Sequence, residues 1–237
     1  MSGPILEFRG VTHRYPGVGA DVLSNVSFSL ARGEMVFLTG ESGAGKSTVL
    51  RLSALQAHPT RGQILFEGRN LAGVKRGQVP EFRQQLGMIF QDFQLLYDRS
   101  VFDNVALPLV ILGLHYADLG RRVRAALDAV GLLGKEDFPP RTLSAGEQQR
   151  VGIARAIVTK PRLVLADEPT GNLDPRRALE VMNLFKLFNQ AGVSLLIASH
   201  QIDLIERLGH RVIHLEQGRV VDSRMAPASR VVTSRAR

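Results

Sequence analysis

Hydrophobic and polar positions along this chain follow two different periods. Short apolar runs predict buried strands over residues 34–39, 62–68, 86–90, 163–166 and 194–198. Helical spacing of apolar positions predicts helices over residues 48–55, 121–130, 148–158 and 177–188. Because strands and helices alternate, the pattern indicates an α/β fold with a mostly parallel sheet covered on both faces.

Both ends of the chain depart from this alternation. Apolar residues alternate with polar ones over residues 6–11 and 22–30, which predicts two strands joined by a turn at Pro16 and Gly17. Near the other end, residues 211–222 predict a hairpin of two strands, 211–215 and 219–222, that turns at Gln217-Gly218.

Residues 91–158 carry few strand signals and much helical spacing, which predicts a helical insertion within the α/β domain. We find no internal repeat and no low-complexity linker in the sequence. The length of 237 residues suits one large domain. We therefore expect a single domain over residues 1–237.

The composition excludes several classes of protein. Cysteine is absent, so there is neither a disulfide framework nor thiolate chemistry, which fits a reducing cytosol. The longest apolar run, residues 105–114, is interrupted by Pro108 and Gly113. A membrane-spanning helix needs about 20 apolar residues, so we expect a soluble protein whose membrane role comes through a partner.

The formal net charge of +8 is partly local, since residues 218–237 carry five arginines and one aspartate. We expect the tail from about residue 224 to be poorly ordered. Two interpretations of this basic tail stay open: contact with anionic lipids, and a solvated tail without a role.

Residues 40–47 match the phosphate-loop pattern G-x-x-x-x-G-K-[ST] and lie between a predicted strand and a predicted helix. Glycines let the backbone curl around an anion, and the helix N-terminus adds its positive dipole end. Lys46 can reach terminal phosphates, and the Ser47 hydroxyl can ligate Mg²⁺. A glycine-rich turn with an ordinary surface lysine would not require a match at every fixed position.

The predicted strand 163–166 ends in two acids, Asp167 and Glu168. On their own these residues favour a helix N-cap. Beside a phosphate loop, Asp167 is expected to hold the magnesium ion, and Glu168 to orient or deprotonate a water at the terminal phosphate.

A second helix begins at Ser144, with Glu147 three residues later, which is the signature of a capping box. Capping alone would account for it, but the N-terminus of a helix also binds anions. The chain then carries two phosphate-directed helix starts, at Lys46 and at Ser144, which need not serve the same nucleotide within one copy.

These motifs, with Gln91, residues 171–174 and His200, stand in the order found in ATP-binding-cassette (ABC) ATPases, which the chain resembles over nearly its whole length. The resemblance implies a phosphate-loop (RecA-like) nucleotide-binding domain with an N-terminal antiparallel β-subdomain. It also implies Mg²⁺-dependent ATP hydrolysis in a head-to-tail homodimer. In finer detail the chain is similar to cell-division members, with lipoprotein-releasing and macrolide-exporting members as the alternative.

The resemblance assigns roles to residues of this chain. The implied nucleotide-binding residues are Tyr15, Gly40, Glu41, Ser42, Gly43, Ala44, Gly45, Lys46, Ser47, Thr48, Gln91, Ser144, Gly146, Glu147, Asp174 and His200. The implied catalytic residues are Lys46, Gln91, Glu168 and His200, and the implied metal ligands are Ser47, Gln91 and Asp167. Each of Tyr15, Gln91 and His200 taken alone also fits a structural role.

Three positions depart from the family pattern. Ala145 stands where glycine is usual, and its Cβ restricts the backbone near the neighbouring phosphate. Glu147 replaces the more frequent glutamine, and Gln201 stands where an acid is common. We expect weaker dimer closure from Ala145, and the contact made at position 201 stays open.

The resemblance implies an integral membrane subunit that docks near residues 91–97, and a location on the inner, cytoplasmic face of the membrane. Apolar residues there suit a partner helix, although they also fit the core of the insertion: Phe93, Leu95, Leu96 and Tyr97. No specific nucleic acid partner is expected, because the family's DNA- and ribosome-directed members carry coiled-coil insertions or two cassettes. Intact Glu168 and His200 argue against a non-catalytic scaffold.

Overall fold

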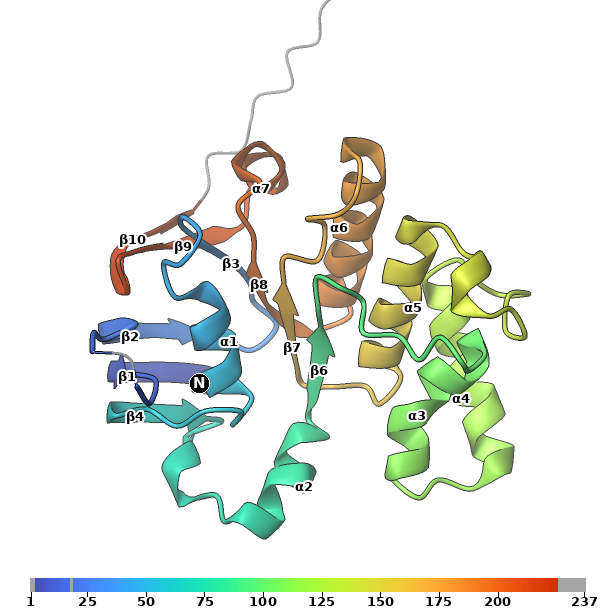
Figure 1. Cartoon of the computed structure of the whole chain (residues 1–237), viewed down its shortest axis with the longest axis horizontal. Coiled ribbons are helices and arrows are strands. Elements are labelled where there is room, and N and C mark those ends of the chain that lie inside the picture. The colour runs from blue at the N-terminus through green and yellow to red at the C-terminus, as the bar shows by residue number, and fades with distance from the viewer. Residues whose placement is uncertain (1–2, 18, 226–237) are drawn as a thin grey trace, which may run out of the picture.

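A six-stranded sheet forms the centre of the protein (Figure 1). The structure is a computed structural model that describes residues 3–17 and 19–225. In spatial order the strands of this sheet are β10 (Arg219–Met225), β9 (Arg211–Glu216), β3 (Met35–Thr39), β8 (Ser194–Ala198), β7 (Leu163–Asp167) and β6 (Leu86–Ile89). All pairs are parallel except β9–β10. Every residue of β3 and β8 is buried, as expected for strands covered on both faces. The predicted parallel sheet is confirmed.

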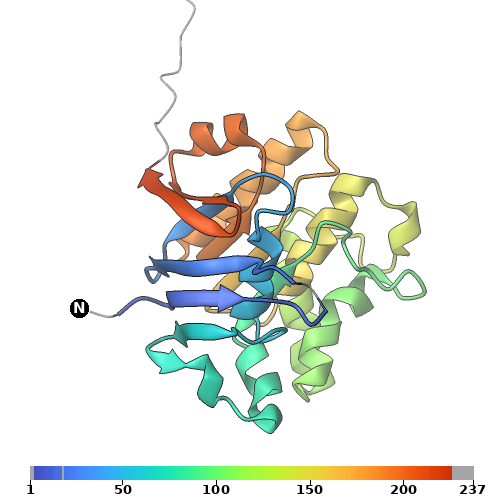
Figure 2. The same ribbon diagram turned by 60° about the vertical axis from the view of Figure 1, so that its left-hand side comes forward.

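A second, antiparallel sheet has the order β2-β1-β4-β5. Its strands are β1 (Leu6–His13), β2 (Leu23–Leu30), β4 (Arg61–Phe66) and β5 (Arg69–Asn70). Buried and exposed residues alternate along β2, so one face packs inward and the other meets solvent. Figure 2 shows β1 and β2 in front of the first helix.

The described residues form seven α-helices: α1 (Lys46–Ser53), α2 (Val79–Arg83), α3 (Val101–Ile111), α4 (Tyr116–Ala129), α5 (Ala145–Ile157), α6 (Pro175–Gln190) and α7 (Ile202–Leu208). Helices α3 and α4 pack against each other and against α5 (Figure 1). Short 3₁₀ turns span Leu71–Gly73, Arg76–Gln78 and Pro140–Thr142. Three helices had no specific prediction, because α2 and α7 are short and α3 contains Pro108. None of the helices in residues 3–17 and 19–225 has the length and apolar content that crossing a membrane requires.

Two hydrophobic clusters lie on opposite faces of the six-stranded sheet. Val36 and Leu38 of β3 belong to the cluster that contains α1 and the antiparallel sheet. Met35 and Phe37 belong to the other cluster, which contains α3 to α6. Helices α1 and α5 therefore cover opposite faces of the sheet, as Figure 1 shows. The predicted basic tail, from about residue 224, falls almost entirely outside the described residues.

Candidate functional site

The predicted phosphate loop, residues 40–47, joins the end of β3 to the start of α1. Gly40, Gly43 and Gly45 have φ angles of 141°, 84° and 106°, where side chains are disfavoured. A Cβ on Gly40 would lie 2.2 Å from the backbone oxygen of Leu215. Glycine is therefore required where the loop passes close to β9. The strand–loop–helix arrangement that the sequence predicted is confirmed.

The Lys46 side chain is buried and folds back over the loop. Its Nζ donates hydrogen bonds to the backbone oxygens of Gly40, at 2.7 Å, and Glu41, at 3.1 Å. The same Nζ lies 3.9 Å from Glu168 Oε1. A single cation thus stands between the phosphate loop and the carboxylate that follows β7, where it can meet a terminal phosphate.

Glu168 and His200 meet because β7 and β8 are parallel neighbours that end at the same edge of the sheet. The Glu168 backbone N–H donates to the Ala198 oxygen at 2.9 Å and holds Glu168 at a φ of 44°. Glu168 Oε2 lies 2.8 Å from His200 Nδ1 and accepts a 3.3 Å hydrogen bond from the His200 backbone N–H. Three of the four predicted catalytic residues, Lys46, Glu168 and His200, are therefore together.

Gln91, the fourth, follows β6 and lies beside the loop after Glu168. A Cβ on Gly171 would lie 3.3 Å from Gln91 Nε2, and the Asn172 Nδ2 donates to the Gln91 backbone oxygen at 3.2 Å. The Gly171 N–H in turn donates to the Glu168 backbone oxygen at 3.1 Å. Glycine at 171 leaves the space that the glutamine side chain occupies.

Oxygen donors of the predicted magnesium set stand at the edge of the sheet where β3 and β7 end. Ser47 is the second residue of α1, and Asp167 is the last residue of β7. Across the described ranges, no group of three His, Cys, Asp or Glu side chains could ligate a metal by itself. This donor set fits Mg²⁺, which commonly takes one or two protein ligands and completes its shell with phosphate oxygens and water.

Tyr15 follows β1 and is half-buried. Its hydroxyl lies 3.2 Å from Thr48 Oγ1, in the first turn of α1. Its ring packs edge-on against His13, with ring centroids 4.6 Å apart. The aromatic ring therefore lies beside the helix that begins at the phosphate loop, and its stacking on adenine stays a prediction.

The second helix start has the capping box that the sequence predicted. Ser144 Oγ accepts from the Glu147 N–H at 3.4 Å, while the Ser144 N–H donates to Glu147 Oε2 at 2.9 Å. The Ser144 hydroxyl donates to the same Oε2 at 2.8 Å. Lys135 Nζ donates to the other oxygen, Glu147 Oε1. The hydrogen bond from Lys135, followed by those from Ser144, lowers the pKa of Glu147 to about 2.

A pocket of about 480 Å³ surrounds this helix start. It is lined by Ser144, Gly146, Glu147, Arg150, Asp174, Arg176, Arg177 and Glu180. Asp174 caps α6 by accepting from the N–H groups of Arg176 and Arg177 at 3.1 Å each. Its contact with a second subunit stays a prediction, as does the effect of Ala145, which is the first residue of α5.

Separate pockets lie beside the phosphate loop and beside Ser144. The pocket beside the phosphate loop is lined by Glu41, Ser42, Gly43, Ala44, His214, Leu215, Glu216 and Gln217. It shares no residue with the pocket at Ser144. The helices that begin at the two sites, α1 and α5, cover opposite faces of the sheet.

Residues 91–97, the segment expected to dock a partner, are hydrogen-bonded to α5. Arg155 of α5 donates to the backbone oxygens of Phe93, at 2.8 Å, and Gln94, at 2.7 Å, both of which have positive φ angles. Tyr97 donates from its hydroxyl to Gln148 Oε1 at 3.1 Å. Arg155 was not predicted, because nothing in the sequence marks a pair 61 or 62 residues apart.

The four apolar residues of this segment are not equally exposed. Leu95 is only 6% exposed and belongs to the hydrophobic core, so it cannot offer a surface to a partner. Phe93 also packs against that core. Leu96 and Tyr97 remain 40% and 39% exposed. Leu95 is therefore excluded from the docking surface, Phe93 is only partly available, and Leu96 and Tyr97 are the most exposed apolar residues of the segment.

Gln201 replaces a common acid and makes a defined contact. Its Oε1 accepts from the Thr170 hydroxyl at 3.1 Å, and its Nε2 donates to the Thr170 backbone oxygen at 3.3 Å. Gln201 thus joins the loop after β8 to the loop after β7, which carry His200 and Glu168. An amide serves here because it both accepts and donates.

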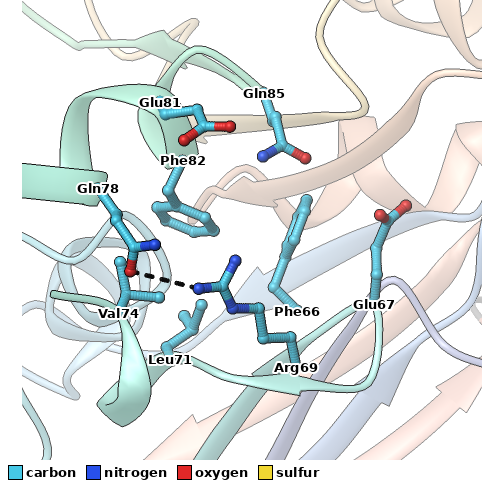
Figure 3. Close-up of a pocket in the computed structure, with 9 residues that line it drawn as sticks. All are labelled: Phe66, Glu67, Arg69, Leu71, Val74, Gln78, Glu81, Phe82 and Gln85. Atoms are coloured by element: carbon cyan, nitrogen blue, oxygen red, sulfur yellow. Dashed lines mark hydrogen bonds between the residues drawn. The ribbon is translucent and has the colours of Figure 1, made fainter.

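A further pocket of about 200 Å³ lies between β4 and α2 (Figure 3). Its walls include Phe66 and Phe82, whose rings meet edge-on with centroids 5.2 Å apart. The Arg69 guanidinium lies beside the two rings and donates a 3.4 Å hydrogen bond to the Gln78 side chain. None of its lining residues belongs to the predicted nucleotide site.

Comparisons with known proteins agree with this geometry. A family model described as "ABC transporter" matches residues 23–171. The chain is 51% identical to the cell division ATP-binding protein FtsE of Escherichia coli K12, over 90% of this chain and 96% of that protein. It is 42% identical to FtsE of Streptococcus pneumoniae D39, over 92% of this chain and 94% of that protein. The dimeric ATP-binding cassette MJ0796 in a post-hydrolysis state, bound to ADP and Pi, matches with a TM-score of 0.84 and 29% identity, covering 93% of this chain and 98% of that one.

Proposed function

The chain belongs to the ABC transporter family, and we propose that it is the ATP-hydrolysing subunit of a membrane complex that acts in cell division. The family and its nucleotide-bound structural neighbour make the chain an ATP hydrolase. The 51% identity to a division ATPase supports the division role over lipoprotein or macrolide export. The observation that carries the catalytic part is the meeting of Lys46, Glu168 and His200 beside the phosphate loop.

Hydrolysis proceeds by in-line attack of water on the terminal phosphate. Lys46 and the N–H groups of the phosphate loop stabilise the charge that develops on the phosphate oxygens. Glu168 orients the water and accepts its proton, and His200 holds the Glu168 carboxylate in place through the 2.8 Å contact. Bound Mg²⁺, held by Ser47 and Asp167 with Gln91 nearby, would neutralise phosphate charge.

Two copies stacked head to tail complete the site. Each copy offers a phosphate loop and, separately, a helix start at Ser144 whose pocket shares no residue with it. In such a dimer the α5 N-terminus of one copy faces the nucleotide held by the other copy. The dimeric state of the structural neighbour supports this arrangement.

The membrane partner is an integral protein resembling FtsX, docked on Leu96 and Tyr97 at the inner face of the membrane. Both residues are exposed, and Tyr97 contacts Gln148 in the first half of α5. A partner that moves this segment therefore also moves the helix that faces the second nucleotide. In this way ATP-driven dimerisation would be coupled to activation of cell-wall hydrolysis outside the cell.

Affinity purification from detergent-solubilised membranes tests the proposal. The tagged chain should retain one integral membrane protein, and the Tyr97→Glu variant should lose it while still binding ATP. The Leu187→Glu variant is the matched control, because Leu187 is an exposed apolar residue of α6. If the wild-type chain retains no integral protein, or if Tyr97→Glu retains it fully, the docking assignment is wrong.

A further inference from the structure

Glu147 places a negative charge where the head-to-tail dimer needs an anion site. Glu147 lies in the first turn of α5, and its carboxylate is ionised at neutral pH. An ionised carboxylate next to a helix N-terminus uses the same favourable dipole that an incoming phosphate would use.

The charges that line the Ser144 pocket balance. Three arginines, Arg150, Arg176 and Arg177, face three acids, Glu147, Asp174 and Glu180. Lys135 does not line this pocket, but its Nζ donates a hydrogen bond to Glu147 Oε1. Lys135 thus adds one positive charge beside this balanced set, which favours the approach of a triphosphate.

Glu147 also holds the hydroxyl that a phosphate would need. The Ser144 hydroxyl has one proton, and it donates that proton to Glu147 Oε2 at 2.8 Å. The Ser144 backbone N–H donates to the same oxygen at 2.9 Å. The Ser144 hydroxyl can donate to a phosphate oxygen only if it no longer donates to Glu147 Oε2. A carboxylate whose charge is offset by a cation is a weaker competing acceptor.

We propose that Lys135 is a positioning residue of the composite nucleotide site. Lys135 pairs with Glu147 Oε1 and offsets the negative charge of Glu147. The Ser144 hydroxyl can then donate its hydrogen bond to a phosphate oxygen of the nucleotide bound by the second copy, instead of to Glu147 Oε2. This inference rests on the proposed head-to-tail dimer. It adds a residue that lies twelve positions before Glu147, outside the capping box of Ser144 and Glu147.

The test measures ATP-dependent dimerisation by light scattering, in the Glu168→Gln background in which the dimer should accumulate. Lys135→Met keeps most of the side-chain volume and removes the charge. It should raise the ATP concentration for half-maximal dimerisation about fivefold, the effect of losing one partly exposed ion pair. Lys75→Met is the matched control, because Lys75 is an exposed lysine that lines neither the pocket beside the phosphate loop nor the pocket beside Ser144.

A second substitution separates electrostatics from structure. Glutamine also completes a capping box, so Glu147→Gln keeps the helix start but removes the charge. In the Glu147→Gln background, Lys135→Met should no longer raise the ATP requirement. A rise of equal size in both backgrounds, or no rise in either, overturns the role of Lys135. If the Glu168→Gln parent itself shows no ATP-dependent dimer, the proposed head-to-tail dimer is wrong. If the parent dimerises but Lys135→Met has no effect, only the role of Lys135 is wrong.

Discussion

The Glu168→Gln substitution exchanges one carboxylate oxygen for an NH₂ group at the point where Lys46 and His200 converge. Glutamine has the same shape, and its amide oxygen can still accept from the His200 backbone N–H, which is 3.3 Å from Glu168 Oε2. It cannot accept a proton from water. We therefore expect nucleotide binding to persist while the chemical step fails.

The size of the effect follows from the role assigned to Glu168. A positioned general base contributes about 100- to 10,000-fold to a rate, which corresponds to about 3 to 5 kcal/mol of activation free energy. The cost in folding stability should be below about 1 kcal/mol, because the glutamine oxygen keeps the contacts with His200 and the ion pair between Glu168 and Lys46 is long, at 3.9 Å, and therefore weak. Removal of a negative charge beside the triphosphate should leave ATP affinity the same or higher.

Phosphate release measures the rate, and light scattering with ATP and Mg²⁺ measures the dimer. The variant should hydrolyse at least about 100-fold more slowly than the wild-type chain and accumulate as a nucleotide-bound dimer. Glu81→Gln, at an exposed glutamate of α2, controls for the change in net charge. Hydrolysis at the wild-type rate in the Glu168→Gln variant would refute the general-base assignment.

Four further substitutions test the loops and the helix start. Arg155→Met should lower the free energy of unfolding by about 2 to 3 kcal/mol in denaturant titrations, because it removes the charged donor from two backbone carbonyls. A decrease in this free energy of less than about 0.5 kcal/mol would contradict the assignment. Gly40→Ala should lower the free energy of unfolding by more than about 2 kcal/mol and abolish ATP binding, because the new Cβ would meet a backbone carbonyl of β9. The control Gly43→Ala places its Cβ more than 4 Å from any heavy atom beyond its two chain neighbours and should lower the free energy of unfolding by about 1 kcal/mol. The pKa of Glu147 is lowered to about 2 from 4.5, so its contribution to stability is complete above about pH 4.5 and is lost as pH falls toward 2. Melting temperatures between pH 7 and pH 2.5 should therefore fall less steeply for Glu147→Gln, and equal slopes would show that Lys135 and Ser144 do not stabilise the ionised form.

Local pattern was sufficient to predict most of the fold. The central strands were predicted within one or two residues, because an apolar run between turn residues is a local signal. The start of α5 was predicted from Ser144 and Glu147, and the structure confirms that capping box. Helix α3 was missed because Pro108 and a nearly uniform apolar run hide its period. Helices α2 and α7 are too short to show a period.

What the sequence by itself determined, then, was which chemical groups the chain carries and which local backbone holds them: the loop at residues 40–47, the acids after β7, and the helix start at Ser144. Only the tertiary structure decided which of these groups meet. Glu168 reaches His200 across 32 residues because β7 and β8 end side by side, and Lys135 reaches Glu147 because the turn after α4 packs against α5. Hydrophobic periodicity reports which face of an element is buried, but the partner of that face is set by the packing of the whole core.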